Sequence, residues 1–167
     1  MLIELSHLDS PVGAVLLAAS SEGLHALDFT ESDGPVRTRL ARAHPGATFG
    51  KGPHVERAAA RVSAYFGGDL SALEELEVAA TGTDFQKKVW AALREIPLGA
   101  TTSYSKIAAA IGNPTAVRAV GAANGKNPIA LVVPCHRVIA ADGTLCGYAG
   151  GLWRKQWLLK HERALLA

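Results

Sequence analysis

The residues best suited to chemistry are a neighbouring cysteine and histidine, Cys135 and His136, which follow an apolar run. A cysteine is a nucleophile only as a thiolate, so it needs a base such as imidazole or a cation such as Arg137 close by. Pro134 restricts the backbone directly before the cysteine. The same residues also fit an unreactive buried cysteine, and spacing alone does not decide between the two interpretations.

The segments around this pair predict its local structure. Ile129–Val133 is entirely apolar and predicts a buried strand. Because neighbouring side chains on a strand point to opposite faces, we expect His136 to reach Cys135 through the backbone turn or a bridging water. Val138–Ala140 should continue extended, and a final helix is expected over Trp153–Leu166.

Two short helices are expected upstream of the cysteine. They cover Tyr104–Ile111 and about Thr115–Asn124, and Gly112-Asn113-Pro114 separates them. This spacing is typical of a helix-turn-helix motif, and equally of a plain helical hairpin. The second helix is nearly bare of bulky side chains, so its backbone can approach a neighbouring helix or a narrow DNA groove closely. Arg118 is the long side chain on it that could reach a base stack.

The first part of the chain predicts a small sheet with helices. Leu2–Leu8, Ala14–Ala19 and Leu24–Phe29 are apolar runs between turn signals, which indicates an antiparallel meander. Val36–Ala43 and Pro53–Phe66 have the spacing of helices.

Residues 69–82 are acidic and then small, so we place a domain boundary there, with domains 1–78 and 79–167. The second domain opens with a predicted capping box, in which the Thr83 hydroxyl and the Gln86 side chain satisfy each other's backbone amides.

Composition and charge restrict the function classes. The chain has 167 residues, 49% of them hydrophobic and 19% charged, which is typical of a globular protein. No apolar run approaches the roughly 20 residues that span a bilayer. Only two cysteines are present, which favours a reducing cytoplasm and gives no zinc-ligand spacing. Residues 1–83 carry a net charge of −5 and residues 84–167 carry +7, so the second half is the one expected to meet a polyanion.

The segment Pro134–Ile139 resembles the active-site signature of the O6-alkylguanine-DNA alkyltransferases, also called methylated-DNA–protein-cysteine methyltransferases. The resemblance continues, in order and spacing, over most of residues 82–162. It includes Gly82–Gln86, Ile96–Gly99, Ser103-Tyr104, Arg118–Gly121, Asn127-Pro128, Gly147–Leu152 and Lys155–Leu159.

The resemblance implies an α/β (α+β) fold with two domains. The N-terminal domain would be a small antiparallel sheet with helices, ribonuclease H-like, and the C-terminal one a winged helix-turn-helix-like domain carrying the cysteine. The implied activity is direct-reversal DNA repair, in which the alkyl group of O6-alkylguanine, and of O4-alkylthymine, passes irreversibly to Cys135 after base flipping through the minor groove. The implied partner is double-stranded DNA. No cofactor, metal or membrane is implied, and a monomer is expected, with cooperative binding along DNA left open.

The resemblance also implies the catalytic roles. Cys135 would accept the alkyl group, and His136 would be its general base, acting through a water. Glu162 would orient that histidine, as in a triad. Asn127 would brace the turn before the cysteine, and Tyr104 would donate a hydrogen bond to a ring nitrogen of the flipped guanine.

Further residues are implied in binding. Tyr104 and the carbonyl of Val138 would bind the base, Tyr148 and the amide of Ala149 would close over the alkylated oxygen, and Lys155 would lie near them. Arg118 would fill the space that the flipped base leaves. The residues expected on DNA are Arg118, Ala119, Ala122, Ala123, Asn124, Lys126 and Arg137.

Cys146 departs from the pattern, because a small or polar residue is more usual there, and it raises the question of a second alkylation or oxidation site. Three other functions remain to be weighed. A lesion-binding protein without transfer activity is disfavoured because Cys135 is present. A transcription factor should present Arg, Asn or Gln to base edges, and a cysteine hydrolase usually takes its base from a distant loop.

Overall fold

The structure is a computed structural model that describes residues 1–164, and it forms two compact units. The first is Met1–Thr81 and the second begins at Gly82. The boundary expected from the sequence lay after residue 78, in the same acidic and small-residue stretch. The two units are described separately below.

The first unit is built on a four-stranded sheet in the order β3-β2-β1-β4. The strands β1 (Leu2–Ser10), β2 (Gly13–Ser20) and β3 (Gly23–Asp28) form the predicted antiparallel meander, which is confirmed. A fourth strand, β4 (Thr48–Gly50), pairs parallel to β1. It was not predicted, because three residues are too few to show an alternating pattern.

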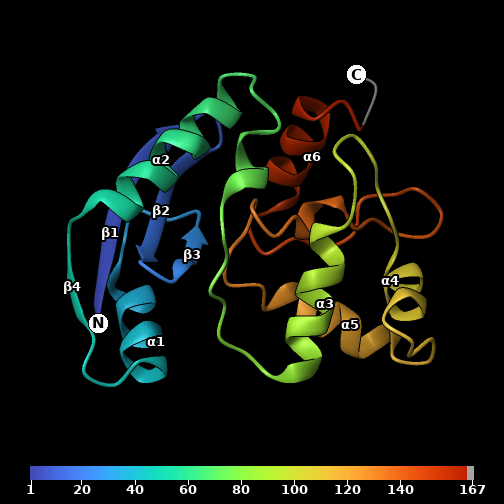
Figure 1. Ribbon diagram of the computed structural model, residues 1–167. Coiled ribbons are helices and arrows are strands. Elements are labelled where there is room, and N and C mark those ends of the chain that lie inside the picture. The colour runs from blue at the N-terminus through green and yellow to red at the C-terminus, as the bar shows by residue number, and fades with distance from the viewer. Residues whose placement is uncertain (165–167) are drawn as a thin grey trace. The chain divides into compact units, whose positions relative to one another are not determined.

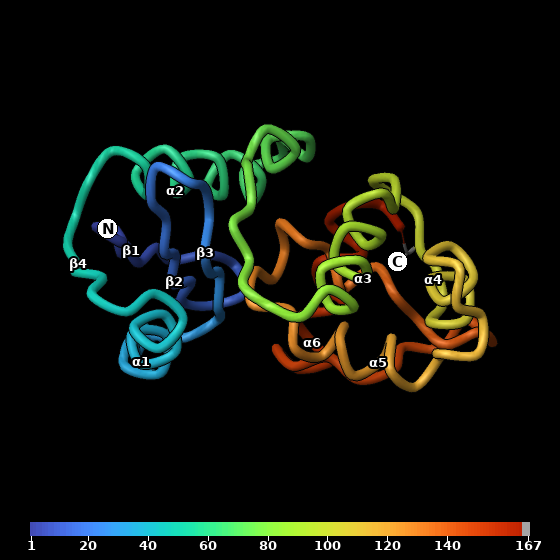
Figure 2. The backbone as a smooth tube through the Cα atoms, turned by 60° about the horizontal axis from the view of Figure 1, so that its bottom comes forward, coloured from blue at the N-terminus to red at the C-terminus, as the bar shows by residue number. Residues whose placement is uncertain are grey.

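Two helices, α1 (Gly34–Ala43) and α2 (Pro53–Phe66), lie on opposite sides of this sheet (Figure 2). Side chains that alternate along the strands fill the layer under α1. These are Ile3, Leu5, Leu16, Ala18 and Ala26, which pack with Val36 and Leu40 of the helix. A 3₁₀ helix, η1 (Ala72–Glu75), follows α2.

Glu4 lies between two core positions of β1 and points to the other face, because successive strand residues alternate. Its carboxylate accepts a hydrogen bond from the Val55 amide at 2.9 Å and lies 2.8 Å from the His54 Nδ1. Burial alone would raise the pKa of Glu4, but these contacts at the start of α2 outweigh burial and lower it. The carboxylate thus caps the helix that covers this face.

The second unit is mainly helical (Figure 1). Its helices are α3 (Asp84–Arg94), α4 (Tyr104–Ala110), α5 (Val117–Gly125) and α6 (Leu152–His161), with a 3₁₀ helix η2 (Cys135–Arg137) before α6. The helix α5 packs against both α3 and α4. The Trp90 indole of α3 donates a hydrogen bond to the Ala123 carbonyl of α5 at 2.9 Å, which fixes these two helices together.

The final helix ends earlier than the sequence predicts. Arg163 has a φ of 63°, in the left-handed region, and the Ala164 amide donates back to the Leu159 carbonyl at 2.8 Å. This closure ends the helix around Glu162. Leu165 and Leu166, which the prediction included, lie outside the described residues.

The predicted strand Ile129–Val133 is wrong. The segment is a series of turns, in which the Val133 amide donates to the Ile129 carbonyl at 3.0 Å and Leu131 has a φ of 72°. Its apolar residues are buried all the same. A run of apolar residues indicates that a segment is buried, but it does not show that its backbone is extended. It therefore cannot distinguish a strand from a buried turn. The extended Val138 that follows pairs with Thr102 in a parallel bridge.

Within residues 1–164, no helix combines the length and apolar character needed to cross a lipid bilayer.

The start of α3 carries the predicted capping box, which is confirmed. The Thr83 hydroxyl accepts from the Gln86 amide at 3.1 Å, and the Gln86 side chain accepts from the Thr83 amide at 3.0 Å. Two backbone amides that have no partner within the helix are thereby satisfied.

Replacing Thr83 by alanine should lower the free energy of unfolding of the second unit by about 1 kcal/mol, since it removes one of these two contacts. The urea midpoint measured by circular dichroism tests this, and Thr81→Ala, on an exposed threonine of the same stretch, serves as the control. Equal midpoints for the Thr83 and Thr81 variants would contradict the cap.

Candidate active site

Cys135 is the first residue of η2, and its side chain is buried, with 7% of the residue exposed. Burial raises the pKa of its thiol. The Asn127 amide, the charge of Lys155 and the Tyr148 hydroxyl act on the thiol in the opposite direction. The resting thiol is therefore held protonated by its surroundings, with groups close by that favour the thiolate.

The next two residues of η2 bind one carboxylate. The His136 Nε2 lies 2.8 Å from one oxygen of Glu162, and the Arg137 Nε donates to the other oxygen at 2.8 Å. The Arg137 guanidinium also donates to the Ile96 carbonyl at 2.9 Å. Both His136 and Glu162 are buried.

The protonation state of this network follows from charge. Burial alone would raise the pKa of Glu162, but the hydrogen bonds and charges of His136 and Arg137 outweigh it and lower the pKa to about 2. An ionised carboxylate can only accept, so the neutral imidazole must carry its proton on Nε2. The lone pair is then on Nδ1, which is buried and has no hydrogen-bond partner among the described residues. Nδ1 is thus free to accept a proton.

Asn127 shapes the turn that leads to the cysteine. Its side-chain amide donates to the Val133 carbonyl at 2.7 Å, and its side-chain oxygen accepts from the Ile129 amide at 3.0 Å. One side chain therefore satisfies both ends of the turn that replaces the expected strand.

A cluster of polar groups surrounds the second thiol, that of Cys146. The Cys146 Sγ is 3.8 Å from the Tyr104 hydroxyl, 3.9 Å from the Val138 carbonyl and 3.8 Å from the Lys155 Nζ. Burial and the neighbouring thiols raise the pKa of Tyr104 to about 12, so this phenol remains a hydrogen-bond donor at neutral pH. Burial lowers the pKa of Lys155.

Tyr148 and Ala149 belong to the irregular segment before α6. The Tyr148 side chain lies close enough to Cys135 to interact with its thiol. Ala149 is exposed, and the Gly151 amide donates to the Tyr148 carbonyl at 2.9 Å. The structure thus brings Tyr104, Val138, Tyr148 and Lys155 to the surroundings of the two thiols.

The residues expected on DNA do not all lie on one face. Arg118, Ala119, Ala122 and Lys126 are exposed and follow helical spacing along one side of α5 and its end. Ala123 and Asn124 are buried, and this is a correction, because Ala123 faces Trp90 and Asn124 hydrogen-bonds Tyr104.

Arg137 also requires correction as an expected DNA contact. Its side chain is only 12% exposed and is directed at Glu162 and Ile96. No local pattern predicts the pair of Arg137 and Glu162, because the two residues lie 25 positions apart. The contact between Lys155 and Cys146 is also not predicted from the sequence, although each residue is singled out there.

The exposed side of α5 contains two glycines, Gly121 and Gly125, that its internal packing does not require. A Cβ built at either position would have nothing within 4 Å. Glycine costs about 1 kcal/mol relative to alanine in a helix interior, so packing within the second unit does not account for Gly121.

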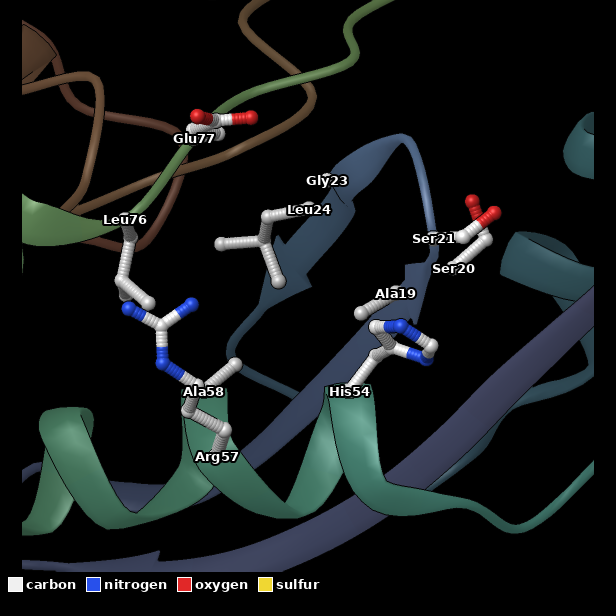
Figure 3. Close-up of a pocket in the computed structure, with 10 residues that line it drawn as sticks. All are labelled: Ala19, Ser20, Ser21, Gly23, Leu24, His54, Arg57, Ala58, Leu76 and Glu77. Carbon is white, nitrogen blue, oxygen red and sulfur yellow. The ribbon is translucent and has the colours of Figure 1, made fainter.

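A small cavity of about 100 Å³ lies in the first unit, and Figure 3 shows the side chains that line it. His54 and Arg57 extend from α2, with the His54 ring beside Ala19 of β2 and the Arg57 guanidinium beside Leu76. None of the residues expected in the site lines this cavity.

The chain matches two domain families. Residues 4–80 match the family "6-O-methylguanine DNA methyltransferase, ribonuclease-like domain", and residues 84–164 match "6-O-methylguanine DNA methyltransferase, DNA binding domain". The expected fold class, a ribonuclease-like domain followed by a helical DNA-binding domain, is thereby confirmed.

Whole-chain relatives agree with these matches. The methylated-DNA–protein-cysteine methyltransferase of Methanosarcina barkeri is 48% identical, over 93% of this chain and 94% of its own length. The protein of that name from Mycobacterium bovis is 46% identical, over 98% and 94%.

Solved structures are similar over the same extent. The O6-methylguanine methyltransferase of Mycobacterium tuberculosis superposes with a TM-score of 0.80 at 43% identity, covering 97% of this chain and 93% of that one. The M. tuberculosis protein in complex with DNA superposes with a TM-score of 0.79 at 41% identity, covering 98% and 94%. With both domains matched and near-complete relatives well above 30% identity, this chain belongs to the 6-O-methylguanine DNA methyltransferase family.

Proposed function

We propose that this chain repairs O6-alkylguanine in DNA by transferring the alkyl group to the sulfur of Cys135. The observation that carries the proposal is the buried Cys135 next to a histidine whose Nε2 is held by an ionised carboxylate. Membership of the family and the names of the relatives support the same activity.

The first step is removal of the thiol proton. His136 follows Cys135 directly in the sequence, and its imidazole has its lone pair on Nδ1, so it can act as the base. It accepts the proton from Cys135, through one water where direct contact is not made. Glu162 stabilises the imidazolium that forms, in the way that a triad carboxylate does.

The second step is displacement at the alkyl carbon. The thiolate attacks that carbon, a sulfur–carbon bond forms, and the bond from the carbon to the guanine O6 breaks. Guanine leaves as an anion and takes up one proton, equivalent to the one that the Cys135 thiol gave to His136, which returns the imidazole to its neutral form. Atoms and charges therefore balance without a co-reactant. A thioether is a poor leaving group, so each molecule reacts once.

The leaving base is stabilised by groups on the pocket wall. The Tyr104 phenol, which stays protonated because its pKa is raised to about 12, donates to a ring nitrogen on which charge develops. The Val138 carbonyl accepts from the guanine amino group. Tyr148 and the amide of Ala149 close over the alkylated oxygen, and Lys155 supplies positive charge near the two thiols.

Double-stranded DNA is the proposed partner, bound along the exposed side of α5. Arg118, Ala119, Ala122 and Lys126 form that side, and its lack of bulk suits a minor groove better than the edge-reading contacts of a major-groove protein. Arg118 enters the stack in place of the flipped base. We further propose a monomer acting in the reducing cytoplasm, since both cysteines are free.

Mixing the protein with a duplex that carries one methyl-labelled O6-methylguanine should move the label to the protein. Intact mass should rise by one methyl group in place of a hydrogen, and peptide mapping should place it on Cys135. The variant Cys135→Ala should bind the same duplex but take no label. Label that remains on DNA with the unaltered protein would overturn the proposal and favour a lesion-binding protein.

Arg118→Ala should slow repair of duplex DNA at least tenfold, while reaction with the free base O6-methylguanine changes little, because only the duplex requires flipping. Single-turnover rates on the two substrates measure this. Arg39→Ala, which removes an exposed arginine of α1, is the matched control. Equal losses on both substrates would contradict a flipping role.

Glu162→Gln should slow transfer and alter the acid sensitivity of the fold. The folded pKa of Glu162, about 2, lies below the unfolded value near 4.3, so its stabilisation is present above pH 4.3 and is lost as pH falls toward 2. That loss is on the order of 2 to 3 kcal/mol. The Gln variant should therefore show a flatter decline of unfolding free energy over pH 5 to 2, measured by urea titration. If the variant loses as much unfolding free energy as the unaltered protein between pH 5 and 2, the Glu162 carboxylate is not the cause of that loss.

A further inference from the structure

The segment that carries Cys146 is held between two local turns. On one side the Thr144 amide and hydroxyl both donate to the Asp142 carboxylate, at 3.0 and 2.7 Å. On the other side the Gly151 amide donates to the Tyr148 carbonyl. Both turns are closed by their own residues, which leaves the position of Cys146 to be set by other contacts.

Lys155 of α6 provides those contacts. Its ammonium donates to the Cys146 carbonyl at 3.0 Å and lies 3.5 Å from the Gly147 carbonyl. Lys155 is fully buried, and none of the ion pairs in the part of the chain that the structure describes includes it. Because a buried cation needs polar partners, it holds these two carbonyls firmly and fixes the direction of the Cys146 side chain.

The Cys146 thiol consequently lies in a corner formed by two other polar groups. Its sulfur is 3.8 Å from the Tyr104 hydroxyl and 3.9 Å from the Val138 carbonyl, to which its S–H donates. These are the two groups that the proposed function assigns to the ring nitrogen and the amino group of guanine. One protein atom and the edge of the base therefore use the same pair of partners.

We propose that Cys146 gates the base pocket. The Cys146 thiol lies in the corner between the Tyr104 hydroxyl and the Val138 carbonyl, and an alkylated guanine enters by displacing it. The inference rests on the proposed function, because that function identifies the corner as the seat of the base edge.

The exchange has a definite chemical direction. A thiol is a weak hydrogen-bond donor, whereas the guanine amino group is an ordinary N–H donor. Guanine therefore replaces the S–H contact to Val138 by a stronger one, and its ring nitrogen accepts from the Tyr104 hydroxyl, to which the thiol is only a weak donor. A flipped base that fits the corner can open it at small cost, and removal of the thiol removes that cost.

The variant Cys146→Ala should increase the single-turnover rate of methyl transfer from O6-methylguanine duplex by roughly two- to fivefold, the range expected for one weak hydrogen bond. Cys146→Ser places a stronger donor on the same Cβ and should not increase the rate. Thr144→Ala loosens the adjacent exposed turn without touching the corner and should leave the rate unchanged. Thermal melts confirm that each variant folds.

A binding measurement separates the gate from the chemistry. In a Cys135→Ser background, adding Cys146→Ala should tighten binding to the O6-methylguanine duplex by the same two- to fivefold, and should not change binding to an undamaged duplex.

The outcomes distinguish the two proposals. If the unaltered protein takes no methyl group, the proposed function fails. If it does, but Cys146→Ala shows unchanged rate and affinity, or Cys146→Ser or Thr144→Ala speeds the reaction equally, the gate is overturned and the function stands.

Discussion

The buried carboxylate of Glu162 is the interaction on which the proposed site depends. It receives His136 and Arg137 from one 3₁₀ turn, and Arg137 continues to the Ile96 carbonyl after α3. Glu162, at the end of α6, therefore holds two residues of η2, and Arg137 links this network to the segment after α3. Breaking a buried ion pair of this kind typically costs about 3 to 5 kcal/mol, because the partner charges remain buried. The same contact fixes the tautomer of His136. Both the packing of these segments and the acid–base chemistry of His136 therefore depend on Glu162.

The approach to Cys135 depends on a second constraint, the turn over residues 127–133. Leu131 has a φ of 72°, a conformation that costs about 1 to 3 kcal/mol for a residue with a side chain. Its burial and the two hydrogen bonds of Asn127 offset that cost. An extended strand would lead the chain away from Glu162. This turn instead places cysteine, histidine and arginine on the short helix η2, beside that carboxylate.

The sequence predicts the parts of this molecule whose signals are local. The meander of the first unit follows from alternation and turn residues, and the start of α3 follows from the Thr83 and Gln86 pair. The motif around Cys135 indicates the family and nominates Glu162, which the structure brings to His136. What the sequence cannot predict is long-range. The apolar segment 129–133 has the composition of a strand but the geometry of a turn, and the burial of Ala123 and Asn124 depends on how α5 packs. The pair Arg137–Glu162, 25 positions apart, exists only once distant segments meet.

The shielding of Cys135 has a consequence under the proposed function, in which each molecule reacts once. With the residue 7% exposed and its thiol kept protonated by burial, dissolved peroxides and stray electrophiles find little to attack while the molecule waits. In the proposed mechanism, Cys135 becomes reactive only when a nucleobase lies beside it and the thiol proton has moved to the imidazole. Slow chemistry in the idle state is what gives a disposable protein a useful lifetime, so that its stock is consumed by lesions and not by storage.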